Sequence, residues 1–313
     1  MIVLINKRVN CRKGCLSKTF SLQTGEVLIM SKSNFFNVPR TFYTTCVTEI
    51  QVPMFFYDVS ERRLNYFVDY NRVLTMLEGT GLLPCKFFNG KAMVSIVFFQ
   101  YRKVTIPAYD EVAITIVVRP KMLPDPSPYI TKILFKKRGA SWGNMGVYIL
   151  EMPVTVPEAR AAGREIWGYP KFLTKIPNKL DGRKFEFSVL DPDTGKDIVS
   201  IKGETGIGIP TKSFDLVCFN NYRDSIWKII VDADAWYTNA RAKKLVMHVG
   251  DSNHRMARNL RDLGLAELKP FVIQSTDRLR IKLNAGTPIA KWKSPEMPYK
   301  YDLETRFLKD KEK

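Results

Sequence analysis

From about Pro53 the chain consists mainly of short runs rich in Val, Ile, Phe and Tyr, each ended by turn-forming residues. Such runs are typical of β-strands. The segment Asp191-Pro-Asp-Thr-Gly195 separates two of them and predicts the turn of a β-hairpin. The predicted strands are Met93–Arg102, Glu111–Val118, Tyr129–Lys136, Val147–Glu151, Phe185–Leu190, Asp197–Lys202, Trp227–Val231 and Phe271–Leu283.

Helical spacing of apolar residues occurs in three segments, which are Asp69–Glu78, Glu158–Trp167 and Asn253–Leu263. Thr155 stands three residues before Glu158, which is the spacing of a capping box. Asp251 or Ser252 is the expected cap of the third helix. So few helices among so many strands exclude a doubly wound sheet. We therefore predict an α+β fold, in which a mainly antiparallel or mixed β-sheet curls into a barrel-like core.

Three regions are expected along the chain. Residues 46–287 carry the strand pattern without a low-complexity linker and are expected to form one domain. Residues 1–45 are expected to be an extension that is disordered or begins at a misassigned start, since Met30 is a second plausible start. Residues 288–313 are rich in proline and charge, and we expect an arm on the surface or on a neighbouring subunit.

The chain carries a formal net charge of +18, which raises the question of an anionic partner. Its basic residues are scattered and no nucleic-acid-binding motif accompanies them, so we expect no nucleic acid partner. A solvated basic surface that attracts small carboxylate substrates is the simpler interpretation. No run approaches the roughly 20 apolar residues that cross a bilayer, and we expect no membrane partner.

The five cysteines include no C-x-x-C pair, and the two histidines lack acidic or cysteine partners at ligand spacing. These patterns predict neither a disulfide framework nor a metal site. We expect a reduced, cytoplasmic compartment.

Lys171 stands directly after a predicted helix end. Pro170 disfavours the helical conformation at Tyr169, so the helix must end near Gly168. The residues around this lysine are mostly large and apolar. A lysine in such surroundings either extends its amine to water or is held in an apolar pocket, where the uncharged amine is favoured. An uncharged amine can attack a ketone and form an iminium.

The segment Gly163-Arg164-Glu165-x-x-Gly168-Tyr169-Pro170-Lys171 resembles the signature around the Schiff-base lysine of acetoacetate decarboxylases. Tyr109-Asp110-Glu111 resembles the Tyr-x-Glu element of this family, whose glutamate lies in the active site. The resemblance extends over about residues 53–284.

The resemblance implies a homo-oligomeric lyase without metal or organic cofactor, which decarboxylates a β-keto acid such as acetoacetate. It implies Lys171 as the nucleophile and Glu111 as the group that handles protons or orients the substrate. If Glu111 faces the pocket, strand alternation places Ala113 and Thr115 beside it. The expected substrate-binding residues are Tyr169, Phe172, Arg164 and Glu165, although Arg164 and Glu165 can also serve only to hold the turn.

Two positions depart from the family pattern. Phe172 stands where the decarboxylases usually have a second lysine. The early-strand arginine of the family falls near Val59, with Arg62 and Arg63 close by. Two alternatives therefore stay open. One is aldol condensation or dehydration of keto acids through the same lysine, and the other is a non-catalytic ligand-binding module.

Overall fold

The computed structural model describes residues 35–87, 89–126 and 143–299. The chain divides into a unit of residues 1–37 and a unit of residues 38–313, and everything below concerns the second unit. The predicted strand Tyr129–Lys136 lies outside the described residues. So do residues 1–34 of the expected N-terminal extension and residues 300–313 of the expected C-terminal arm.

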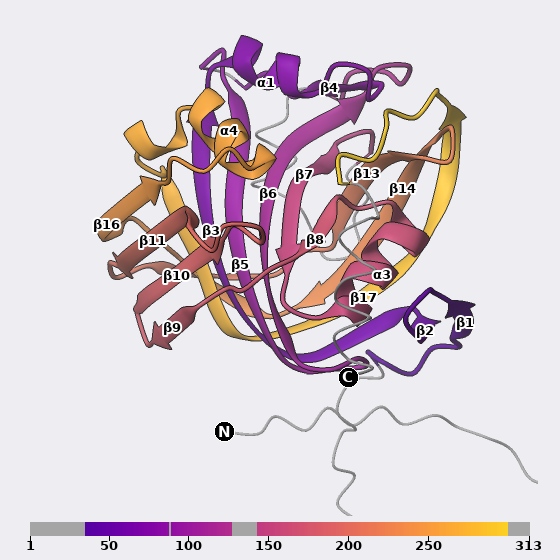
Figure 1. Cartoon of the computed structure of the whole chain (residues 1–313), viewed down its shortest axis with the longest axis horizontal. Coiled ribbons are helices and arrows are strands. Elements are labelled where there is room, and N and C mark those ends of the chain that lie inside the picture. The colour runs from indigo at the N-terminus through magenta and orange to yellow at the C-terminus, as the bar shows by residue number, and fades with distance from the viewer. Residues whose placement is uncertain (1–34, 88, 127–142, 300–313) are drawn as a thin grey trace, which may run out of the picture. The chain divides into compact units, whose positions relative to one another are not determined.

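A closed barrel of seven strands forms the centre of the structure (Figure 1). Around the ring the strands are β3 (Met54–Val68), β5 (Ala92–Val104), β6 (Tyr109–Pro120), β7 (Gly146–Val154), β13 (Leu216–Tyr222), β14 (Ser225–Asp234) and β17 (Val272–Lys291). Pairing between β17 and β3 closes the barrel. The sheet is mixed because β13 and β7 run parallel, whereas the other neighbours are antiparallel. The predicted α+β fold with a barrel-like core is confirmed.

Shorter strands extend the barrel sheet. They are β4 (Leu82–Pro84) beside β6, β8 (Lys171–Leu173) parallel to β7, β15 (Trp236–Ala240) beside β17, and β12 (Ile209–Lys212) beside β15. A two-stranded sheet holds β1 (Thr41–Thr44) and β2 (Glu49–Val52). A four-stranded sheet has the order β16 (Ala242–Val249), β11 (Asp197–Thr205), β10 (Lys184–Leu190) and β9 (Asn178–Asp181).

The four-stranded sheet packs against the barrel through stacked aromatic rings. The ring centroids of Phe98 on β5 and Phe187 on β10 are 4.9 Å apart, and both side chains are fully buried. The predicted hairpin joins β10 to β11. Its Asp191 side chain accepts the backbone N–H groups of Asp193 and Thr194, and Gly195 takes a left-handed φ of 70°.

Three α-helices lie among the described residues, close to the three predicted segments, and are α1 (Tyr70–Met76), α3 (Pro157–Trp167) and α4 (Arg255–Asp262). A 3-10 turn, Leu265–Glu267, follows α4. The predicted caps of α3 and α4 are wrong. Thr155 is drawn to the neighbouring strand, where its hydroxyl accepts the N–H of Asp110, and the N-cap of α3 is Val156 without a side-chain bond. The N-cap of α4 is His254, whose Nδ1 accepts the N–H of Met256.

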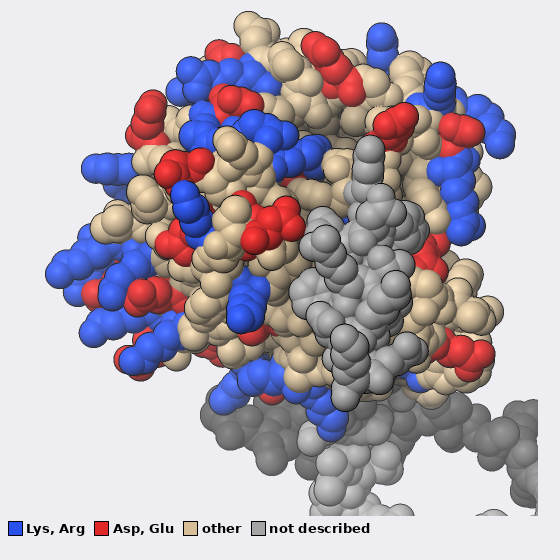
Figure 2. All heavy atoms as spheres, in the orientation of Figure 1, with Lys and Arg blue, Asp and Glu red and all other residues tan. Residues whose placement is uncertain are grey.

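Charged side chains are distributed widely over the surface. Figure 2 shows Lys and Arg spread over the visible face and mixed with Asp and Glu. The described part of the expected arm, residues 288–299, begins as a continuation of β17 and contacts other parts of this chain. Trp292 donates its indole N–H to the carbonyl of Gly79, and the Tyr299 hydroxyl donates to Glu151.

Candidate active site

Lys171 is the first residue of β8 and lies four residues after Trp167, the last residue of α3. Gly168 closes the helix in the left-handed conformation with φ 67°, which favours glycine. Its N–H and that of Tyr169 return to the carbonyls of Arg164 and Gly163. A Cβ at Gly168 would lie 2.4 Å from Cγ of Tyr222, so no larger residue fits. The chain therefore turns sharply and pairs Lys171 with Met152 of β7.

The amine of Lys171 is buried and paired with Glu111. Nζ lies 2.6 Å from Oε2 of Glu111, and only 6% of Lys171 and 1% of Glu111 are exposed. The other carboxylate oxygen of Glu111 accepts the Tyr101 hydroxyl at 3.0 Å. The ring centroid of Tyr109 lies 5.7 Å from Nζ. The site therefore holds the amine of Lys171 and the carboxyl group of Glu111 in direct contact and largely shielded from bulk water.

The two tyrosines of this cluster stay protonated. Burial raises the pKa of Tyr101 and of Tyr109 well above the usual value, and the negative charge of Glu111 raises both further. Tyr101 is consequently a permanent hydrogen-bond donor to Glu111. Its ring contacts that of Tyr109, with centroids 4.5 Å apart, which keeps both rings against the cavity wall.

A cavity of about 90 Å³ lies in front of the amine, and its wall is mostly apolar. On β6 its lining includes Glu111, Ala113 and Thr115, the face that strand alternation predicts when Glu111 points inward. The other lining residues are Phe56, Arg63, Val97, Phe99, Tyr101, Tyr109, Val147, Ile149, Met152, Tyr169, Lys171, Leu216, Cys218, Val231, Ile281 and Leu283. The cavity is small and suits a short substrate.

Arg63, and not Arg62, lines this cavity. The two residues are neighbours on β3 and point to opposite faces of the barrel wall. Nε of Arg63 donates to Glu61 at 2.7 Å, and the Tyr237 hydroxyl donates to the same carboxylate at 2.6 Å. Burial lowers the pKa of Arg63 and the charge of Glu61 raises it, with a net increase, so the guanidinium stays cationic. Val59, near which the family pattern places its early arginine, is fully buried.

The remaining predicted site residues divide between the cavity and the turn. Tyr169 lines the cavity and is 3% exposed. Arg164 donates from Nε to the carbonyl of Lys171 at 2.5 Å. Glu165 accepts the N–H of Cys46 at 3.1 Å. Arg164 thus contacts the backbone just after the turn, Glu165 contacts a segment distant in the sequence, and neither lines the cavity.

Phe172 lies on the side of β8 opposite to Lys171. Its ring packs against His254 and Tyr299, with centroid distances of 4.5 and 4.8 Å. The position that carries a second lysine in the decarboxylases therefore belongs here to an aromatic cluster behind the strand. We find Phe172 placed to support β8, away from the cavity lining.

Tyr101 and Cys218 are site residues that the sequence interpretation did not single out. Tyr101 pairs in register with Tyr109 across β5 and β6. A short connection joins these two strands and fixes their register, so the sequence could have predicted that Tyr101 lies beside Tyr109. Cys218 comes from β13, which joins the site only through barrel closure, and no local signal marks it.

Within the described ranges no cluster of three or more His, Cys, Asp or Glu side chains could hold a metal ion. No helix among the described residues is long and apolar enough to span a membrane.

A family model described as acetoacetate decarboxylase (ADC) matches residues 47–253. The fold is similar to the crystal structure of acetoacetate decarboxylase from Legionella pneumophila, with a TM-score of 0.53, 16% identity and coverage of 76% of this chain and 88% of that one. A second acetoacetate decarboxylase structure gives a TM-score of 0.52, 14% identity and coverage of 76% and 90%. An acetoacetate decarboxylase-like enzyme from Sphingomonas wittichii RW1 gives 0.51, 11% identity and coverage of 75% and 92%. No curated protein sequence matches the chain.

Proposed function

The chain belongs to the acetoacetate decarboxylase family, and we propose that it decarboxylates a short β-keto acid through an imine formed on Lys171. The observation that carries this proposal is the buried contact between Nζ of Lys171 and the carboxylate of Glu111, 2.6 Å apart at the wall of a small apolar cavity. A lysine that serves only to hold structure has no need of a cavity in front of its amine.

Glu111 prepares the amine for attack. The contact distance allows the ammonium proton to pass directly to the carboxylate, which leaves a neutral amine and a protonated glutamate. The apolar lining favours this neutral pair over the separated charges once a substrate displaces water. The Tyr101 hydroxyl keeps Glu111 oriented toward Lys171 throughout.

The reaction then follows the chemistry of an amine and a ketone. Nζ of Lys171 adds to the carbonyl carbon, Glu111 returns its proton to the oxygen, and loss of water gives the iminium. The bond between the α-carbon and the carboxylate breaks, its electron pair moves into an enamine, and CO₂ leaves. Protonation of the enamine carbon and hydrolysis of the imine release the ketone and restore Lys171.

Arg63 favours the binding of an anionic substrate. Its guanidinium lines the same cavity as Lys171 and is held on one side by Glu61. Such a cation attracts a carboxylate into a space whose other walls are mostly apolar. The apolar walls then favour neutral CO₂ over the carboxylate when the bond breaks.

Arg63 is also the observation that favours a second candidate. If the guanidinium holds the substrate carboxylate through the whole reaction, the enamine forms by loss of a proton instead of CO₂. The enamine can then attack an aldehyde, which is aldol condensation of a keto acid. Acetoacetate separates the two, since only the decarboxylase converts it to acetone and CO₂, whereas the aldolase requires pyruvate with an aldehyde.

The imine is tested by reduction with borohydride in the presence of acetoacetate or pyruvate, followed by peptide mass spectrometry. We expect one adduct on Lys171 and none in Lys171→Arg, because a guanidinium cannot form the imine. Lys175→Arg is the matched control, since Lys175 is an exposed lysine close to the same strand. Ligand binding without an adduct on Lys171 would support a non-catalytic module and reject both enzymatic candidates.

A further inference from the structure

A wide basic cleft lies on the outer face of the barrel wall, separate from the Lys171 cavity. Its volume is about 900 Å³, within the range of ligand sites. It lies where the turn between β9 and β10, the link from β11 to β12, and the strands β15 and β17 meet. Arg62 lines it, on the opposite side of β3 from Arg63.

Cationic residues outnumber acidic residues in the lining of the cleft. The lining charges comprise five cations, Arg62, Arg183, Lys212, Arg278 and Arg280, and two carboxylates, Asp234 and Asp277. Both carboxylates are already neutralised. Asp277 accepts hydrogen bonds from both terminal N–H groups of Arg62, with N···O distances of 2.9 and 3.2 Å, and Asp234 forms an ion pair with Arg280.

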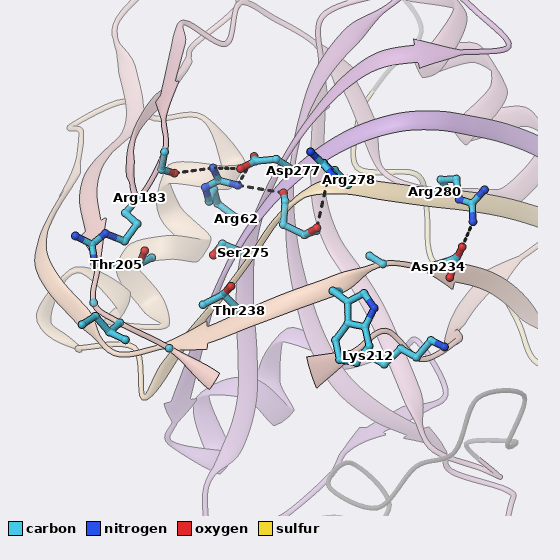
Figure 3. A pocket seen from close by; sticks show the side chains of 17 residues that line it. Arg62, Arg183, Thr205, Lys212, Asp234, Thr238, Ser275, Asp277, Arg278 and Arg280 are labelled. Atoms are coloured by element: carbon cyan, nitrogen blue, oxygen red, sulfur yellow. Dashed lines mark hydrogen bonds and ion pairs between the residues drawn. The ribbon is translucent and has the colours of Figure 1, made fainter. Parts of the chain in front are cut away.

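Arg183, Lys212 and Arg278 make no ion pair with any carboxylate that the structure describes, and all three are exposed. Figure 3 shows Arg183 at one end of the cleft and Lys212 at the other, with Arg62 and Asp277 between Arg183 and Arg278. Like charges that share a concave surface create a positive potential that concentrates anions.

The floor of the cleft offers further hydrogen-bond donors. Arg62 is 1% exposed, and its Nε has no hydrogen-bond partner among the described residues. The hydroxyls of Thr205, Thr238 and Ser275 line the cleft as well. Buried guanidinium nitrogens and hydroxyls beside unpaired cations are the groups that bind phosphate.

Trp236 adds a flat apolar surface to this basic cleft. It lines the cleft and 65% of it is exposed, which is unusual for an indole. An aromatic ring beside cations suits a ligand that combines a planar ring with phosphates.

From this juxtaposition we propose that the outer cleft binds a phosphorylated ligand of nucleotide size, with its phosphates on Arg183 and Arg278 and its ring on Trp236. The site is independent of the Lys171 chemistry. Binding there requires no turnover, and the inactive Lys171→Arg protein should bind as the wild type does.

The test is calorimetric titration of the full chain with ADP, pyrophosphate and inorganic phosphate at low and high salt. We expect ADP to bind with a Kd below about 1 mM, more tightly than pyrophosphate, and more weakly at high salt. The double variant Arg183→Ala with Arg278→Ala should raise the Kd for ADP at least about tenfold. Trp236→Leu should make the Kd for ADP equal to that for pyrophosphate.

The matched control is Lys91→Ala with Lys269→Ala, which removes the same charge from exposed positions outside the cleft lining. We expect this protein to bind ADP as the wild type does. Equal loss in both double variants would identify non-specific attraction to a basic protein and overturn the proposal. Absence of ADP and pyrophosphate binding at millimolar concentration would overturn it too.

Discussion

A Cβ atom on Gly163 would lie 2.3 Å from Cδ of Lys171 and 2.5 Å from its Cε. The aliphatic part of the reactive side chain therefore lies directly against the backbone of α3. Nζ follows directly after Cε, and Lys171 is buried with little room to move aside. The helix thus sets the position of Nζ relative to Glu111.

Gly163→Ala is expected to displace Lys171 without unfolding the protein. Alanine favours a helix interior by about 1 kcal/mol over glycine, which offsets part of the crowding. We expect kcat/KM to fall at least about tenfold, since small displacements of a reacting group are costly, with a modest change in Tm. Gly206→Ala is the control, because its Cβ would meet only the carbonyl of Arg241, at 3.3 Å. Equal activity of both variants would contradict the packing argument.

Glu111→Gln tests proton transfer at the amine. The amide keeps the shape of the carboxylate and can still accept the Tyr101 hydroxyl, but it cannot take the proton of Lys171. We expect kcat/KM to fall by a factor of about 10² to 10⁴, as for the loss of a general base. Single-turnover imine trapping with borohydride measures the step directly. Tyr101→Phe, which removes only the orienting bond, should have the smaller effect, and the reverse order would count against Glu111 as the base.

Arg63→Met tests recognition of the substrate carboxylate. We expect KM for a keto acid to rise at least about tenfold, because a charge-assisted contact is lost. The same change leaves the buried Glu61 without its ion pair, which costs roughly 1–3 kcal/mol of stability. Arg63→Met with Glu61→Gln separates the effects, since it should recover Tm but not KM. Arg278→Met removes an exposed arginine outside the cavity and should alter neither.

Glu151 is expected to make stability depend on pH. Burial raises its pKa to about 7, although Arg255, Tyr299 and Asn259 each lower it. The unfolded chain releases this proton near the usual value of 4.5, so between pH 4.5 and 7 the folded state holds more protons. Stability should therefore fall as pH rises through this range, by at most roughly 3 kcal/mol from this group. Denaturant titrations from pH 5 to 8 measure the slope.

Glu151→Gln is the control for this pH dependence. The amide does not titrate, so the slope that Glu151 contributes between pH 5 and 7 should disappear. A slope of the same size in Glu151→Gln would assign the effect to other groups.

The local sequence was sufficient to predict those features that depend on residues close together in the chain. Gly168 and Pro170 end α3 and expose Lys171 at a turn, and period-two alternation put Ala113 and Thr115 on the side of Glu111. The hairpin at Asp191 was readable for the same reason, because its side chain bonds backbone groups two and three residues ahead. Neighbouring residues decide backbone conformation through steric and short-range hydrogen-bond terms.

The site itself depends on pairings between distant segments. Glu111 meets Lys171 across 60 residues of sequence, and Arg63 faces the cavity only because β3 pairs with β17 in one register. A shift of one residue in that register would have turned Arg62 inward instead. Thr155 caps no helix since a distant strand competes for its hydroxyl. Strand register and barrel closure are set by packing of the whole core, and no local pattern encodes which face of β3 ends inside.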